Sequence, residues 1–139
     1  MVYVALFPDA PEELAGAIQD RHRATFGSQL VTTNRTPNPR PAEFLKIMGV
    51  GGQRRDPVTD VPTLAVEAWA SSRSRAAELA QEARAIIWSL EGTSAAGYAV
   101  SEVAEFAAPA DMPDPLSDQH RYTGTYAVAI RTETIVNII

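Results

Sequence analysis

Residues 60–90 read DVPTLAVEAWASSRSRAAELAQEARAIIWSL, and this stretch decides the fold. Hydrophobic and polar residues alternate over residues 61–70, which predicts a β-strand whose two faces differ in character. The face that we expect to be buried carries Leu64, Val66 and Ala68. The opposite face carries Thr63, Glu67 and Trp69.

A long amphipathic helix is expected directly after this strand. Ser71 or Ser72 offers a side-chain oxygen for its N-cap, and Gly92 is a suitable C-terminal stop. At about 100° per residue, an apolar stripe falls within about 60° of one line along the helix. The stripe consists of Ala76, Leu79, Ala80, Ala83, Ile86, Ile87 and Leu90. We expect it to pack on a sheet that contains the preceding strand.

Trp88 does not belong to this stripe. It lies roughly 140° away around the helix, on the side that carries polar residues. A large indole in this position favours a surface that contacts a partner. The alternative is that a loop of the same chain folds over it.

The composition describes an ordinary folded domain. With 139 residues, 45% apolar and 21% charged, the chain has the size and balance of one domain. It has no cysteine, which excludes disulfides and thiolate chemistry. A net charge of −5 argues against a protein that reads nucleic-acid sequence. The apolar residues 1–7 carry no Lys or Arg and meet Pro8 at once, so we expect neither a signal peptide nor a membrane span there.

The remaining elements follow from periodicity and from turn residues. A helix is predicted from about residue 10 to residue 26, with Gly27 as its stop. Further strands are predicted at residues 29–33, 44–50, 98–106 and 122–130, with a bulge near Glu102 and Val103. The fold class is therefore α+β: a mostly antiparallel sheet of four to five strands with two helices packed on one face. We expect a single domain over residues 1–139, with apolar terminal arms at residues 1–7 and 132–139.

Three loops connect these elements. Residues 34–41 contain three prolines, residues 51–57 begin with two glycines, and residues 107–119 form a long acidic loop. Gly49, Gly51 and Gly52 lack the spacing of a phosphate-binding loop, so a hairpin turn is the better interpretation. The acidic side chains near His120 lack the regular spacing and the glycine of a calcium loop, so a solvated loop is favoured there.

The sequence contains no motif for catalysis. Neither His22 nor His120 has a second histidine or a serine elbow at a useful spacing. Glu102 and Glu105 stand three residues apart on one strand, which directs them to opposite faces. We therefore expect no catalytic residues, no cofactor and no metal.

Cations gather around the strand at residues 44–50. Five of the twelve basic residues lie within about twenty positions there, and they are Arg35, Arg40, Lys46, Arg54 and Arg55. One interpretation is a solvated hairpin of mixed charge, since Glu43 and Asp56 intervene. The other is an electrostatic contact with an acidic neighbour or a passing phosphate backbone.

Apolar arms at both ends, Trp88 off the core stripe and a proline-rich loop together exceed what a small monomer normally exposes. Jointly they favour the subunit of an assembly. The candidate interface residues are Arg35, Arg40, Arg54, Arg55, Trp88, Asp114 and Arg121.

Six segments also carry a resemblance to a known family. They are NRTP (34–37), PAEFLKI (41–47), GGQRRDPVTDVPTL (51–64), EAWA (67–70), WSLEG (88–92) and PDPLSDQHRY (113–122). These residues resemble the tail terminator proteins of long-tailed, siphovirus-type phages of actinobacteria, and the resemblance extends over residues 8–131. Its motifs are structural rather than catalytic.

The resemblance implies a virion protein of the tail neck, assembled in the host cytoplasm. Such a subunit closes into a homo-oligomeric ring, commonly a hexamer, at the head-proximal end of the tail tube. The ring ends tube polymerisation and gives the head–tail connector a docking surface, while the genome DNA passes through its lumen unread. No enzymatic activity, no cofactor and no membrane contact are implied. Loops 34–41, 49–57 and 107–119 are the expected contact regions.

Two alternatives remain. The chain is another ring protein of the neck, a head–tail stopper or completion protein, or it is a small-ligand-binding α+β module. An enzyme of unrecognised type belongs with this last class. Gene order or an image of the particle separates the first alternative, and a thermal-shift screen with metabolites addresses the second.

Overall fold

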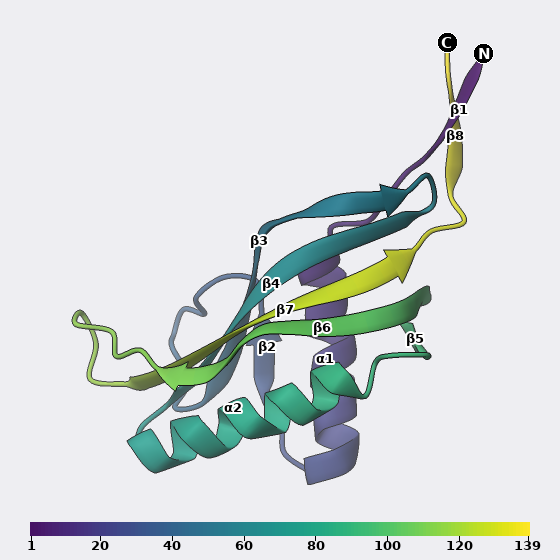
Figure 1. The fold of residues 1–139 in the computed structure, drawn as a ribbon. Helices are drawn as coiled ribbons and strands as arrows, with labels where there is room; N and C mark the ends of the chain where they lie inside the picture. The colour runs from purple at the N-terminus through teal and green to yellow at the C-terminus, as the bar shows by residue number, and fades with distance from the viewer.

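The computed structural model describes all 139 residues, which form a long curled sheet, two helices and a small terminal ribbon (Figure 1). The elements in chain order are β1 (Val2–Ala5), α1 (Ala10–Phe26), β2 (Val31–Thr33), β3 (Phe44–Asp56), β4 (Thr59–Ala70), α2 (Arg73–Trp88), β5 (Ser94–Ala95), β6 (Tyr98–Asp111), β7 (His120–Arg131) and β8 (Ile135–Ile138). The main sheet has the strand order β2-β3-β4-β7-β6-β5, and β1 pairs only with β8.

The α+β class and the mostly antiparallel sheet are confirmed, because only β2 and β3 pair in parallel. The predicted strand number of four to five is wrong, since the main sheet has six strands and the ribbon adds two. β5 has only two residues, which is too short for a periodic pattern to reveal. β1 and β8 come from opposite ends of the chain, so their pairing has no local signal.

β4 and α2 form as the central stretch predicts. The Ser72 hydroxyl caps α2 by accepting a hydrogen bond from the backbone N–H of Arg75 at 3.2 Å. All seven residues of the predicted stripe are buried. Gly92 is not the stop, because the helix ends at Trp88 with Ser89 as its C-cap. Gly92 has a φ of 76° and serves the turn toward β5 instead.

The core lies between the sheet and the two helices, which share one face. α1 contributes Leu14 and Ile18, and α2 contributes Leu79 and Ile87 to the same buried cluster that holds Leu64 of β4. Gly27 ends α1 in the left-handed conformation, as predicted. Close packing of apolar side chains from the sheet and both helices is the main source of stability here.

Two predicted loops are shorter than expected because their strands continue. β3 runs to Asp56, and positive φ angles at Gly51 and Gly52 make a bulge in the strand rather than a turn. A Cβ at Gly52 would collide with the backbone oxygen of Val61, so the position requires glycine. β6 runs to Asp111 through further irregular pairings. The bulge predicted near Glu102 is confirmed between Val100 and Glu102.

The long strands give the sheet two distinct ends. At the end that we call the loop end, residues 34–43 and 112–119 lie together, because the Gln119 amide donates to the carbonyls of Pro41 and Ala42 at 2.9 and 3.1 Å. At the ribbon end, the β3–β4 turn lies beside the segments that lead to β1 and β8 (Figure 1). The twelve residues of β4 span roughly 36 Å between these ends at the usual rise per residue.

The terminal arms form the ribbon. β1 and β8 pair antiparallel, with Val2 opposite Ile138 and Val4 opposite Val136. Figure 1 shows the ribbon leaving the body, with both chain ends at its tip. The backbone N–H of Leu6 donates to the carbonyl of Thr134 at its base, at 2.9 Å. Most of its large apolar side chains are exposed, Ile138 to 53%.

Candidate interaction surfaces

At the loop end, a buried tryptophan lies on the sheet face that the helices do not cover. Trp69 is 3% exposed and stacks on Phe44, with ring centroids 5.4 Å apart and planes 9° from parallel. The guanidinium groups of Arg40 and Arg121 lie 5.1 and 5.3 Å from the Trp69 ring centroid. Arg40 comes from the loop before β3, whereas Arg121 lies directly opposite Trp69 on the neighbouring strand β7. A loop and a strand together therefore close this part of the face with aromatic and cationic contacts.

Glu67 completes the polar contacts of this cluster. It is buried and accepts hydrogen bonds from the Trp69 indole N–H at 3.2 Å and from Arg121 at 3.4 Å. Arg121 also donates through Nε to the carbonyl of Met112 at 2.7 Å, which fixes the start of the acidic loop. Because the buried carboxylate, the indole N–H and the guanidinium all have partners, the burial of these polar groups is compensated.

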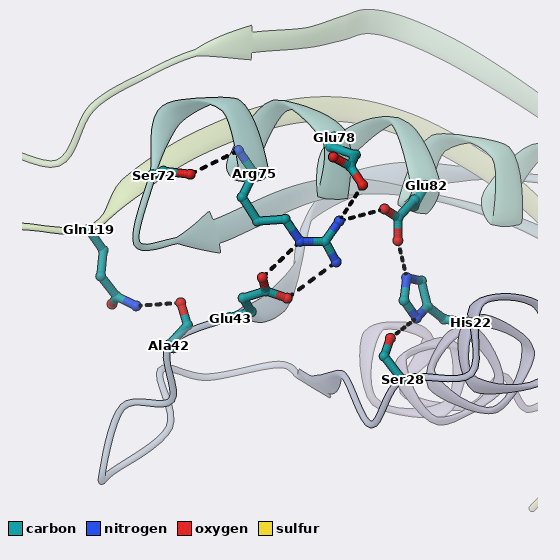
Figure 2. Close-up of polar contacts among 9 residues, drawn as sticks. All are labelled: His22, Ser28, Ala42, Glu43, Ser72, Arg75, Glu78, Glu82 and Gln119. Atoms are coloured by element: carbon teal, nitrogen blue, oxygen red, sulfur yellow. Dashed lines mark hydrogen bonds and ion pairs between the residues drawn. The ribbon is translucent and has the colours of Figure 1, made fainter.

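On the opposite side of the sheet, a network of charged residues ties α1, α2 and the segment before β3 together (Figure 2). Arg75 donates to both carboxylate oxygens of Glu43, at 2.8 and 3.2 Å. The same guanidinium donates to Glu78 at 2.9 Å and to Glu82 at 2.8 Å. The hydrogen bond that Arg75 donates to Glu43 is the largest of the effects that hold the pKa of Arg75 above its ordinary value.

His22 extends this network into the core. Its side chain is fully buried, and Nε2 lies 2.8 Å from a Glu82 oxygen that does not contact Arg75 (Figure 2). A carboxylate only accepts hydrogen bonds, so Nε2 carries a proton here. Nδ1 faces the Ser28 hydroxyl at 3.5 Å. Glu82 thus links α1 to α2 by joining a buried imidazole to a guanidinium.

Trp88 takes part in a third cluster, on the outer side of α2. Arg84 donates to both oxygens of Glu105 at 2.7 Å, and the Trp88 indole donates to the same carboxylate at 3.3 Å. The Arg84 contact and the indole hydrogen bond hold the pKa of Glu105 below its ordinary value. The indole remains 42% exposed, so no loop covers it. Exposed aromatic area beside a satisfied ion pair is typical of a contact surface.

At the ribbon end, the uncovered sheet face forms an open groove of about 640 Å³. Small and apolar side chains line it, namely Val61, Thr63, Ala127 and Phe106, together with Gly52, Gln53, Arg54 and Arg55. Phe106 is 65% exposed. Arg54 lies over the Phe7 ring at 4.9 Å, and Arg55 pairs with Glu102 at 3.0 Å.

The seven predicted interface residues do not form one surface. Arg40 and Arg121 meet at Trp69 in the loop end, where Arg35 is exposed and Asp114 closes a tight turn by accepting from the N–H of Leu116. Arg54 and Arg55 lie at the ribbon end, and Trp88 lies on α2. The predicted cluster of cations around β3 is therefore divided between two ends of the sheet.

Sequence analysis missed three of these features. Helical spacing places Arg75, Glu78 and Glu82 on one side of α2 and could have revealed part of the network. Nothing local indicates that Glu43 and His22 join it. The burial of Trp69 and Glu67 depends on Arg40 and Arg121 from elsewhere in the chain, and the pairing of β1 with β8 joins residues 130 or more positions apart.

None of the helices is both long and apolar enough to cross a membrane. No group of three or more His, Asp or Glu side chains stands close enough to hold a metal ion. Comparison with protein-family models and with curated proteins found no match for this chain.

Proposed function

We propose that this protein is a structural subunit of the neck of a long-tailed phage. Copies of it close into a ring at the head-proximal end of the tail tube, end tube polymerisation and present a docking surface to the head–tail connector. The proposal is supported by the resemblance of residues 8–131 to tail terminator proteins. It leaves no role for a cofactor or for turnover of a substrate.

The observation that carries this proposal is the uneven covering of the sheet. The face away from the helices is closed by loops at one end, yet open at the other, where Phe106 is 65% exposed. The apolar ribbon projects from that same end. A monomer gains nothing from exposing two apolar surfaces side by side, whereas a ring subunit needs two different surfaces for its two neighbours.

The charge distribution is compatible with a lumen through which DNA passes. The chain carries a net charge of −5, so a ring of copies repels the phosphate backbone rather than gripping it. Six of its twelve Lys and Arg side chains pair with carboxylates of the same chain, as for Arg75 and Arg84. Such a ring guides DNA without reading its sequence.

The test is to measure mass and tube binding together. Light scattering on the purified protein, alone and with the tail tube subunit, should give a discrete multiple of 15.0 kDa. Electron microscopy should then show the oligomer at one end of each tube, with tubes of limited length. Protomers that stay single in both conditions, or tubes that grow without limit in its presence, would contradict the proposal.

A ring at the neck that leaves tube length unchanged would instead favour a head–tail stopper or completion protein. A particle image in which the ring lies between the connector and a separately terminated tube separates these two. The assembly role is common to both, and the position in the neck distinguishes them.

A further inference from the structure

The ribbon has one face made only of β-branched aliphatic side chains. Since Val2 pairs with Ile138 and Val4 pairs with Val136, these four residues lie on one side of the two strands. Neither β1 nor β8 contains a charged side chain. Isolated two-stranded ribbons are marginal in water even without such a face. The ribbon therefore needs a cover.

Its own sheet cannot supply that cover. Three backbone and side-chain contacts hold the base of the ribbon: the N–H of Leu6 on the carbonyl of Thr134, the Thr132 hydroxyl on the carbonyl of Leu6, and the N–H of Thr132 on the carbonyl of Val58, at 2.9, 2.9 and 3.1 Å. They direct the ribbon away from the body (Figure 1). The first two join the arms to each other, and the third ties the base to the β3–β4 turn, so folding the ribbon back against the sheet would break that third bond.

A lipid surface does not fit the ribbon either. Membrane-bound segments combine apolar side chains with Lys or Arg that meet anionic headgroups. The ribbon strands have no cation, and the charged residue nearest to β8 along the chain is the exposed, acidic Glu133. Arg131 belongs to β7 of the body, where it pairs with Thr59 of β4. The complementary surface is thus apolar with cations at its rim.

The groove at the ribbon end has this character. Its lining includes Val61, Thr63 and Ala127, which are small enough for aliphatic side chains to pack against them, together with the ring of Phe106. The exposed side chains of Arg54 and Arg55 line it as well. Each copy carries a net charge of −5, so copies repel one another. An acidic copy therefore binds most favourably to a part of its neighbour that presents cations.

From these observations we infer that the ribbon of one copy packs, by its Val2/Val4/Val136/Ile138 face, into the groove of a second copy. The contact is heterologous, since ribbon and groove are different surfaces of the same chain. Each copy inserts its ribbon into one neighbour and receives the ribbon of the other. The copies therefore form a closed ring when a whole number of copy-to-copy rotations makes a full turn. The inference rests on the proposed function, which supplies the ring that this contact would build.

The chain has no cysteine, which permits a direct test by single-site cross-linking. Two variants are purified with tags of different size: Val136→Cys, on the apolar face of the ribbon, and Thr63→Cys, in the groove. They are mixed and treated with a short bis-maleimide. The expected product is a cross-linked pair that contains one chain of each kind.

The matched control is Asn137→Cys, one residue further along β8 and on the opposite face of the ribbon. Mixed with Thr63→Cys, it should give at least tenfold less cross-linked pair. Products that join Val136→Cys chains to one another, in preference to Thr63→Cys, would show that ribbons pack on ribbons and would overturn the inference. Equal yields from both ribbon positions, or no cross-linking at all, would also overturn it.

A second pair of variants tests the same contact without cysteine. Val136→Asp places a charge on the buried face of the contact and should convert the assembly to protomers by light scattering, whereas Asn137→Asp should not. The melting temperature of the body should be the same for both. Assembly that survives Val136→Asp would contradict the inference.

The cross-linking result and the tube-binding result can disagree, and each disagreement is informative. Cross-linking as expected, together with free tube ends, would retain the ribbon contact and reject the phage-neck function. A ring on tube ends that shows no Val136–Thr63 cross-link would retain the function and reject the ribbon contact.

Discussion

The two ends of the same sheet face are treated in opposite ways. At the loop end, Arg40 from the loop before β3 and Arg121 from β7 lie over the Trp69 ring, and the polar groups of Glu67 and Arg121 find partners within the chain. At the ribbon end, the same face is open and an apolar ribbon projects beside it. This difference shows that the pattern along a strand fixes which side chains share a face, whereas the segments that connect the strands determine whether that face is covered.

Trp69→Ala is expected to have the largest effect on stability. The ring is almost fully buried between Phe44 and two guanidinium groups, so its removal should lower the free energy of unfolding by about 3–5 kcal/mol. Urea unfolding followed by circular dichroism measures this. A loss of only a few tenths of a kcal/mol would mean that the loops do not hold the loop end closed.

Arg75→Met tests the network on the helix side of the loop end. The change leaves Glu43, Glu78 and Glu82 facing one another without their shared cation, so we expect a loss of about 1–3 kcal/mol. Arg75→Lys is the matched control, since it keeps the charge but not the paired contacts with Glu43. It should recover part of the loss, and identical unfolding curves for the two variants would show that charge alone is irrelevant.

The pH dependence of stability in the wild-type protein and in Tyr126→Phe tests the core beneath the open part of the sheet face. Burial raises the pKa of its phenol to about 12 from the ordinary value of 10.0. The folded pKa is the higher one, so its contribution to stability is present below pH 10 and is lost as the pH rises toward 12. The stability of Tyr126→Phe, measured by urea titration at each pH, should fall less steeply over that range. Parallel curves for the two proteins would indicate that the phenol is not desolvated.

Trp88→Ala is expected to change stability by about 1 kcal/mol or less, because the indole is partly exposed and makes one hydrogen bond. Comparison with Trp69→Ala distinguishes the partly exposed tryptophan from the buried one. Light scattering of the variant tests whether α2 contributes to an interface. A loss of stability as large as that of Trp69→Ala would place Trp88 in the core.

Reversing the charges at the ribbon end should have the smallest effect on stability and a large one on assembly. In Arg54→Glu with Arg55→Glu, unfolding should shift by less than about 0.5 kcal/mol, since both side chains are exposed. The oligomer should dissociate, because the groove rim then repels an acidic copy. Arg35→Glu with Arg40→Glu makes the same charge change at the loop end and should leave self-association intact.

The sequence predicted much of this molecule because its strongest signals are local. The alternation in residues 61–70 and the stripe from Ala76 to Leu90 identified β4, α2 and the face they share. The sequence narrowed the cap of α2 to Ser71 or Ser72, of which Ser72 is the cap, and it identified Gly27 as the stop of α1, because the chemistry of these residues is specific to helix ends. The long extensions of β3 and β6 were missed, because glycine and proline at bulges resemble turn residues when read alone.

The candidate interface residues stay a prediction, and their arrangement in space differs from the one that the sequence suggested. Arg40 and Arg54 are fourteen positions apart, so they seemed to belong to one basic region. Extended chain moves far with each residue, however, and β3 carries them to opposite ends of the sheet. Proximity in sequence is a poor guide to proximity in space along a strand of thirteen residues.

From the sequence alone come the α+β class, the apolar stripe that holds α2 on β4, and the apolar residues at both termini. Periodicity and caps act over a few residues, so they can be read without a structure. Three features are visible only in the tertiary structure. The two termini pair as a ribbon, His22 and Glu43 bind the α2 side chains Glu82 and Arg75, and one end of the sheet is covered while the other is open. Those features join distant segments, and no local pattern encodes such contacts.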